Sequence, residues 1–207
     1  MDEVFIPAAA VVLPGAISAP AEPLGTVVFA HGSGSSRSSP RNVQVADALN
    51  EAGLATLLFD LLTEEEARDR ANVFDIPLLA ERLAAATVWV ASEPALRGLP
   101  IGYFGASTGG AAALWAAAEH GCVSAIVSRG GRPDLAAPRL AAVRAPTLLI
   151  VGGRDEVVLE LNRDALESLT CEAQLAVVEG ATHLFEEPGA LEEVSRLACD
   201  WLARHLA

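Results

Sequence analysis

Runs of apolar residues recur along the chain, separated by segments in which the apolar positions follow helical spacing. Residues 26–30, Thr-Val-Val-Phe-Ala, carry no charge on either alternating face, a pattern typical of a strand covered on both sides of a parallel sheet. Each such run predicts a buried strand. Further runs occupy residues 54–59, the stretch beginning at 101, and residues 123–127, 147–151 and 173–178.

Helices are predicted between these strands from apolar residues three and four positions apart. Pro77 opens one helix, and Gly53 and Gly121 close two others, as these residues do at helix ends. The alternation of strands and helices predicts the α/β class, with a doubly wound, mostly parallel sheet and helices on both faces. The predicted helices cover residues 41–52, 77–90, 111–120, 134–143, 162–169 and 191–202.

Two stretches do not follow this alternation. Residues 4–13 are apolar and partly β-branched, and they predict one or two strands that begin the sheet, with a turn at Pro14-Gly15. Residues 63–75 are charged and irregular, so they either cover part of a site or form a solvated loop. We find no repeat or linker, and the 207 residues predict a single domain, 1–207.

A formal net charge of −13 narrows the range of partners. An acidic surface repels phosphate backbones and anionic lipid, so we expect neither a nucleic acid nor a membrane as partner. The cysteines at 122, 171 and 199 fit no metal-binding spacing, and we expect reduced thiols and no metal. The acidic N-terminus and the lack of a long uncharged apolar stretch predict a cytoplasmic protein.

The stretch Gly105-Ala106-Ser107-Thr108-Gly109 joins a predicted strand to a predicted helix. A Gly-x-Ser-x-Gly sequence in this position is typical of a sharp turn that exposes the serine hydroxyl above the sheet. Glycine is needed on both sides because the strand and the helix pass close together. The helix directs its positive end at the serine, where negative charge develops during acyl transfer. Ser107 is therefore the candidate nucleophile.

A serine needs a base to remove its proton. His183 follows the last predicted strand and Asp155 follows the strand before it, so both belong to the carboxyl edge, where α/β proteins place their sites. The order Ser, Asp, His is the order found in serine hydrolases built around such a turn. We predict Ser107 as nucleophile, His183 as base and Asp155 as the orienting carboxylate, with Glu156 and Glu179 as alternatives to Asp155.

The anion formed by serine attack needs two backbone N–H donors. Thr108, directly after the nucleophile, is predicted to provide one. Ser33, in the loop after the strand 26–30, is predicted to provide the other. We interpret His31, two residues earlier, as a brace for this loop rather than as a catalytic group.

Together these residues resemble the α/β-hydrolase superfamily, and within it the dienelactone hydrolase-like branch of small esterases without a cap. The resemblance covers nearly the whole chain and implies ester hydrolysis through an acyl-enzyme, without a metal or an organic cofactor. The matching motifs, in chain order, are His31-Gly32-Ser33-Gly34, Gly105-Ala106-Ser107-Thr108-Gly109-Gly110, Gly153-Arg154-Asp155 and Ala181-Thr182-His183.

Two features adjust the expected substrate, a small-molecule ester. Dienelactone hydrolases carry a cysteine where this chain has Ser107, so we expect general activity on small or short-chain carboxylic esters. The segment between Arg129 and the strand at 147 is too short for a lid domain, so we expect an open site. The alternatives are a thioesterase or acyltransferase with the same three residues, a lactone hydrolase of dienelactone type, and a non-catalytic binding protein on this fold.

Several arginines are candidate substrate-binding residues. Arg129 ends a predicted strand and Arg132 follows it, and Arg37 and Arg41, beside the predicted oxyanion loop, could serve instead. A guanidinium in such a place can bind a substrate carboxylate through two hydrogen bonds. Pairing with an acidic side chain such as Asp60 is the structural alternative.

Overall fold

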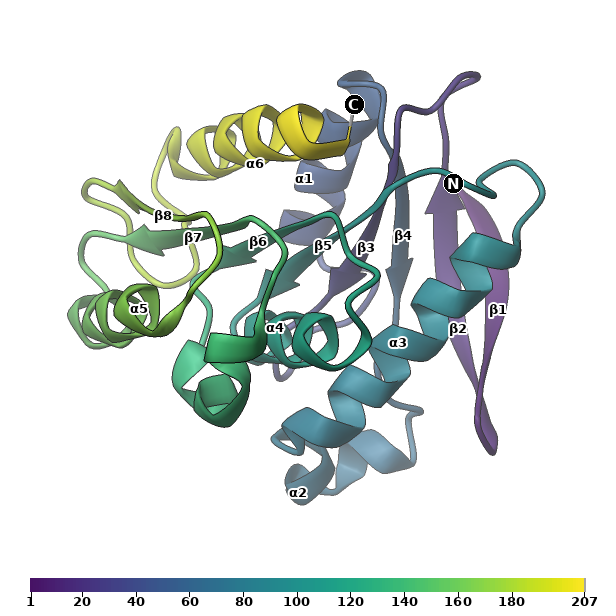
Figure 1. The fold of residues 1–207 in the computed structure, drawn as a ribbon, viewed down its shortest axis with the longest axis horizontal. Coiled ribbons are helices and arrows are strands. Elements are labelled where there is room, and N and C mark those ends of the chain that lie inside the picture. The colour runs from purple at the N-terminus through teal and green to yellow at the C-terminus, as the bar shows by residue number, and fades with distance from the viewer. Residues whose placement is uncertain (207) are drawn as a thin grey trace.

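The computed structural model describes residues 1–206, which form one eight-stranded sheet with helices on both faces (Figure 1). The strands follow each other across the sheet in the order β1-β2-β4-β3-β5-β6-β7-β8. The pairs β1–β2 and β2–β4 are antiparallel and the other pairs are parallel, which confirms the predicted mostly parallel sheet. The strands are β1 Asp2–Ala8, β2 Val11–Ser18, β3 Thr26–Ala30, β4 Ala55–Phe59, β5 Ile101–Ala106, β6 Ala125–Arg129, β7 Thr147–Gly152 and β8 Ala173–Val178.

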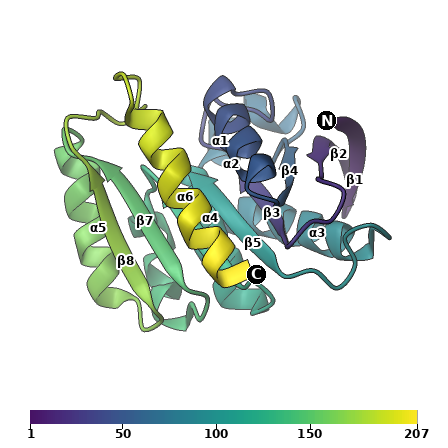
Figure 2. The same cartoon turned by 90° about the horizontal axis from the view of Figure 1, so that it is seen from above.

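Helices cover both faces of this sheet, as the alternating pattern predicts. Helices α1 and α6 pack against each other over one face, and α3, α4 and α5 lie on the other (Figures 1 and 2). Strands β3 to β7 are buried along their whole length between these layers, which explains why they read as uninterrupted apolar runs. The helices are α1 Pro40–Glu51, α2 Arg70–Val73, α3 Ile76–Ser92, α4 Thr108–His120, α5 Glu156–Ser168 and α6 Ala190–Leu206, with 3₁₀ segments η1 Glu66–Arg68 and η2 Pro133–Ala142.

The predicted turn at Pro14-Gly15 is wrong, because both residues lie inside β2. The chain turns instead between β1 and β2, at Ala9, whose φ is +54°. The strand tolerates Pro14 because its carbonyl points toward β4 and accepts a hydrogen bond from the Asp60 N–H at 3.0 Å. The missing N–H of the proline faces the same neighbour just beyond the last residue pair of β2 and β4, Gly15 and Phe59, so at most the last hydrogen bond between these strands is lost.

Two predicted helices differ from the observed elements. Residues 134–143 form the 3₁₀ segment η2 rather than an α-helix, because Pro138 lies inside it and cannot donate a backbone hydrogen bond. Helix α5 begins at Glu156, directly after Asp155, and not at 162. No helix within residues 1–206 has both the length and the apolar character needed to cross a bilayer.

Helix α4 packs directly on the backbones of β3 and β5 at two glycines. A β-carbon on Gly109 would lie 2.0 Å from the Ala30 carbonyl oxygen, and one on Gly105 would lie 2.5 Å from the Gly109 carbonyl oxygen. Both distances are far shorter than any real contact, so only glycine fits. Backbone contacts therefore fix the place where β5 ends and α4 begins.

Candidate functional site

Ser107 occupies the turn between β5 and α4 in a strained conformation, with φ 51° and ψ −119°. Residues other than glycine rarely adopt a positive φ, and such strain concentrates at functional sites. Three backbone hydrogen bonds hold the residue there. The Ser107 N–H donates to the Arg129 carbonyl (3.1 Å), and the Ser107 carbonyl accepts from the N–H groups of Gly110 (3.0 Å) and Arg132 (3.1 Å).

His183 and Asp155 are joined by a hydrogen bond at the carboxyl edge of the sheet. Asp155 follows β7 and His183 lies between β8 and α6. The distance from His183 Nδ1 to Asp155 Oδ2 is 2.6 Å, and the Asp155 side chain is only 15% exposed. When Nδ1–H donates to this carboxylate, Nε2 is left free to act as a base. Within residues 1–206, the alternative carboxylates of Glu156 and Glu179 are exposed and make no hydrogen bond to His183.

Ser107 and His183 both contact one bend of the chain, Arg129–Gly130. The Ser107 N–H donates to the Arg129 carbonyl, and Gly130, at φ +52°, lies against the imidazole, so that a β-carbon there would be 3.4 Å from His183 Cε1. No hydrogen bond joins Ser107 Oγ to His183 in the part of the chain that the structure describes. Such bonds are often long in enzymes without substrate and shorten when it binds.

The loop after β3 packs on Ser107, and the two predicted oxyanion donors lie in this loop and at the start of α4. A β-carbon on Gly32 would lie 3.0 Å from Ser107 Cβ, so Ser33 directly follows a residue that packs on Ser107. Thr108 is the first residue of α4, where N–H groups have no acceptor inside the helix. For residues 1–206, neither the Ser33 nor the Thr108 N–H donates a backbone hydrogen bond. Both are therefore available to an anion beside Ser107.

His31 bridges the ends of β3 and β4 in its neutral form. Its Nε2 accepts a hydrogen bond from the Leu61 N–H at 3.1 Å, so the proton of the ring lies on Nδ1, which donates to the Gly32 carbonyl at 3.0 Å. Burial lowers the pKa of His31 below its usual 6.5. The structure therefore places His31 as a brace between the loop after β3 and the chain after β4.

This arrangement predicts that His31 makes the protein less stable in acid. Above pH 6.5 the imidazole is neutral in the folded and the unfolded chain. As the pH falls below 6.5, the unfolded chain takes up the proton first, so the free energy of unfolding decreases until the folded pKa is passed. Urea unfolding at pH 7.5 and pH 5.0 should show a larger loss for the wild type than for His31→Asn. Equal losses in the two proteins would contradict this role.

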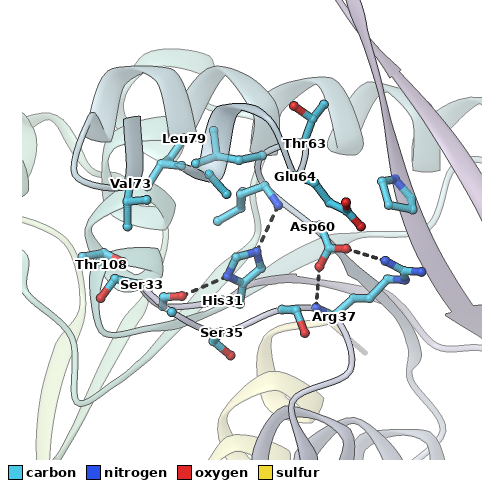
Figure 3. Close-up of a pocket in the computed structure, with 17 residues that line it drawn as sticks. His31, Ser33, Ser35, Arg37, Asp60, Thr63, Glu64, Val73, Leu79 and Thr108 are labelled. Atoms are coloured by element: carbon cyan, nitrogen blue, oxygen red, sulfur yellow. Dashed lines mark hydrogen bonds and ion pairs between the residues drawn. The ribbon is translucent and has the colours of Figure 1, made fainter. Parts of the chain in front are cut away.

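A cavity of about 420 Å³ opens beside Ser33 and Thr108 (Figure 3). This volume lies in the range of small-molecule sites, which are mostly apolar with a few polar groups. Apolar side chains come from β2, the chain after β4, α2 and α3, and polar ones from the loop after β3, the chain after β4 and the start of α4. The residues that line it are Pro14, His31, Gly32, Ser33, Gly34, Ser35, Ser36, Arg37, Asp60, Leu61, Leu62, Thr63, Glu64, Ala67, Val73, Leu79 and Thr108.

The charged segment 63–75 forms one wall of this cavity and is anchored by a capping box. The Thr63 N–H donates to Glu66 Oε2 (2.9 Å), and the Glu66 N–H donates to Thr63 Oγ1 (3.2 Å). Arg82 of α3 donates to Glu66 Oε1 (2.8 Å) and to the Ala8 carbonyl of β1 (2.6 Å). The segment therefore lies over a cavity beside Ser33 and Thr108, and the interpretation that it covers part of a site stays a prediction. The sequence signal for this anchor is Thr63-x-x-Glu66, a pattern typical of the start of a helix.

Arg37 lines the cavity, but an acidic partner holds its guanidinium. The Asp60 carboxylate accepts a hydrogen bond from the backbone N–H of Arg37 at 2.7 Å and also forms an ion pair with Arg37 Nη1. A second carboxylate, that of Glu3, lies 3.8 Å from Arg37 Nη2. The expected alternative, an ion pair with Asp60, is therefore present, and the role of Arg37 in binding a substrate carboxylate stays a prediction.

Arg129 is buried below the edge of the sheet and does not line the cavity. Its neighbour Ser128 contacts Gly110 of α4, so the alternation of the strand turns Arg129 to the other face, 6.0 Å from the centre of the Phe104 ring. Burial and the nearby Arg41 lower the pKa of Arg129 to about 10. Within residues 1–206 the guanidinium has no carboxylate partner, and its role in binding substrate stays a prediction.

Metal-binding side chains are scattered rather than grouped in the structure. In residues 1–206, no three His, Cys, Asp or Glu side chains lie close enough together to hold a metal ion. The thiols of Cys122, Cys171 and Cys199 are free, and Cys122 is exposed.

Comparison with known proteins places this geometry in a family. A family model described as an alpha/beta hydrolase domain matches residues 23–205. The crystal structure of dienelactone hydrolase from Anabaena variabilis superposes with a TM-score of 0.95 at 54% identity, over 100% of this chain and 99% of that chain. Est1E from Butyrivibrio proteoclasticus shares the fold, with a TM-score of 0.84 at 17% identity over 98% of both chains.

Two curated relatives from Mycobacterium tuberculosis are each 62% identical over 206 residues, or 99% of this chain. Their names propose a phosphoribosyl transferase. The chain spans 46% of their length, so the activity in those names does not follow for it. The strained serine, the sheet order and these matches together show that the chain belongs to the α/β-hydrolase domain family and is dienelactone hydrolase-like.

Proposed function

We propose that this protein is a serine hydrolase that cleaves small carboxylic esters. One observation carries the proposal: a serine at positive φ shares an edge of the sheet with a histidine that is hydrogen-bonded to a partly buried carboxylate. The turn exposes a nucleophile, and an imidazole oriented by a carboxylate is the usual base for it. Membership of a hydrolase family supports the same reaction class.

In the proposed reaction, His183 Nε2 accepts the hydroxyl proton as Ser107 Oγ attacks the ester carbonyl carbon. The N–H groups of Ser33 and Thr108 donate to the oxyanion. Asp155 holds the imidazole in orientation and stabilises its cation. His183 then donates the proton to the leaving alcohol oxygen, which leaves an acyl group on Ser107. His183 then takes a proton from a water molecule whose oxygen attacks the acyl carbon, and it returns the proton to Ser107 Oγ as the bond between this oxygen and the acyl carbon breaks and the acid is released.

The connection between β6 and β7 supports a preference for small substrates. It contains only the short segment η2 and neighbouring loop residues, with no room for a lid domain. A site without a lid leaves long substrates largely in water. An acyl-thioester would satisfy the same geometry, because only the leaving atom differs, so the two substrate classes are separated by experiment.

A fluorophosphonate probe tests the proposed nucleophile. We expect the probe to add its mass to one peptide, the one that contains Ser107, because only an activated serine reacts readily. Hydrolysis of p-nitrophenyl acetate and butyrate should fall in proportion to the labelled fraction. Labelling of another residue, or full turnover by fully labelled protein, would contradict the proposal. Faster turnover of acyl-thioesters than of oxygen esters would change the proposed class to thioesterase.

A further inference from the structure

The proposed intermediate leaves one direction open at its tetrahedral carbon. One substituent is Ser107 Oγ, and a second is the oxyanion, which faces the N–H groups of Ser33 and Thr108. A third is the leaving oxygen, which must lie next to His183 to receive its proton. The fourth substituent is the acyl chain, which must therefore extend away from His183.

The cavity lies on that side of Ser107. Strands β3 and β4 lie on one side of β5, and β7 and β8 lie on the other (Figure 1). His183 follows β8, whereas the cavity is lined by residues that follow β3 and β4 and includes Ser33 and Thr108 at its edge (Figure 3). An acyl chain that extends from the tetrahedral carbon in the direction away from His183 therefore enters this cavity.

The wall opposite the loop after β3 is apolar and preformed. Leu61, Leu62 and Leu79 are buried in the core while they line the cavity, and Val73 completes the apolar surface. The capping box between Thr63 and Glu66 and the bonds of Arg82 to Glu66 and to β1 hold this wall against the sheet. A fixed apolar wall stabilises hydrocarbon groups and gives a charged group nothing to bind.

The charged side chains of the cavity also disfavour an anion. The only guanidinium among them, Arg37, is paired with Asp60, and the exposed carboxylate of Glu64 adds a second negative charge. One positive and two negative side chains leave a balance of −1. His31 adds no positive charge, because its Nε2 accepts the Leu61 N–H.

We propose that this cavity is the acyl site and that it selects uncharged acyl groups longer than acetyl over acyl groups that carry a carboxylate. The inference rests on the proposed function and adds to it the chemical class of the acid that is released. It separates this chain from hydrolases that bind a carboxylate on the acyl group through a free arginine, because Arg37 is paired with Asp60.

Filling the cavity tests the acyl assignment. Ala67 is exposed and lines the cavity, whereas Ala71 is exposed in α2 and does not. We expect Ala67→Trp to lower kcat/KM for p-nitrophenyl hexanoate about tenfold or more, because overpacking a fixed cavity is costly, while p-nitrophenyl acetate changes less than about twofold. Ala71→Trp should leave the ratio of the two esters as in the wild type. Ala67→Phe provides a smaller filling residue in case the tryptophan variant does not fold.

Two results would overturn the acyl assignment. One is an unchanged ratio of hexanoate to acetate turnover in both folded Ala67 variants. The other is a loss that follows the length of the alcohol in a series of acetate esters, since this would place the leaving group in the cavity. In either case wild-type turnover of acetate esters and labelling of Ser107 would still support the hydrolase. If the wild type hydrolyses no ester, the proposed function fails and the inference fails with it.

Recharging the edge of the cavity tests the preference for neutral acids. We expect Glu64→Arg to raise kcat/KM for the p-nitrophenyl monoester of glutarate relative to p-nitrophenyl pentanoate by about fivefold at low salt, as for a partly exposed charge pair. Glu65→Arg changes the net charge equally but does not line the cavity, so it should leave this ratio unchanged. A wild type that already prefers the glutarate ester, or equal effects of the two variants, would contradict the charge argument.

Discussion

Ser107→Ala is expected to lower kcat/KM for p-nitrophenyl butyrate by about five orders of magnitude, the scale on which serine hydrolases depend on their nucleophile. Alanine keeps the β-carbon and therefore the same strained backbone at φ 51°, so the change removes only the hydroxyl. The hydrogen bonds of the Ser107 backbone to Arg129, Gly110 and Arg132 do not involve the side chain. The variant should fold as the wild type does, and steady-state kinetics then report the chemistry alone.

A serine outside the site provides the matched control. Ser168 is exposed at the end of α5, where its hydroxyl bonds only to a carbonyl of its own helix. Ser168→Ala should keep wild-type turnover and fluorophosphonate labelling, and Ser107→Ala should lose both. Turnover by Ser107→Ala within tenfold of the wild type would remove the proposed mechanism, provided that both variants show the same thermal unfolding.

Asp155→Asn is expected to lower kcat by about four orders of magnitude while the fold is kept, the size seen when the same exchange is made in another serine hydrolase. The Asp155 carboxylate only accepts hydrogen bonds, so it fixes the proton of His183 on Nδ1. An asparagine amide can donate to Nδ1 instead, which moves the ring proton to Nε2. An imidazole in that form has no lone pair directed at the serine and cannot take its proton.

The neighbouring carboxylates separate this role from a general effect of charge. Glu156 and Glu179 are exposed, and each loses one negative charge when it is replaced by glutamine, as Asp155 does on replacement by asparagine. We expect Glu156→Gln and Glu179→Gln to keep kcat within about threefold, since surface substitutions have small effects. A loss in Glu156→Gln as large as that in Asp155→Asn would contradict the assignment of the orienting role to Asp155.

The buried strands could be predicted because each reads as an apolar run, and all those predicted after residue 25 lie within two residues of the observed ones. The position of the turn in the N-terminal hairpin could not be predicted, because Pro14-Gly15 is a strong local turn signal. Whether a proline is tolerated in a strand depends on which neighbour its missing N–H faces. This depends on where β2 stops pairing with β4, and a single sequence does not contain that information.

The pairing of His183 with Asp155 was predictable from chain order, because consecutive parallel strands bring their following loops to one edge. The surroundings of Arg129 were not. Strand alternation could have placed its side chain on the face of Val127, below the edge of the sheet, rather than at the edge. The cavity depends on residues 61–79 folding back over the loop after β3, a tertiary arrangement for which the sequence offers only the Thr63-x-x-Glu66 cap.

In the proposed mechanism, different strands carry the residues for bond cleavage and those for substrate choice. The proposed catalytic side chains follow β5, β7 and β8, whereas the cavity is built from the chain after β3 and β4. Only the backbone of Ser33 and Thr108 belongs to both. If the chain cleaves esters as proposed, its descendants can acquire new ester preferences by changes confined to residues 60–79 that leave the proposed catalytic residues unchanged, and protein engineers can follow the same route.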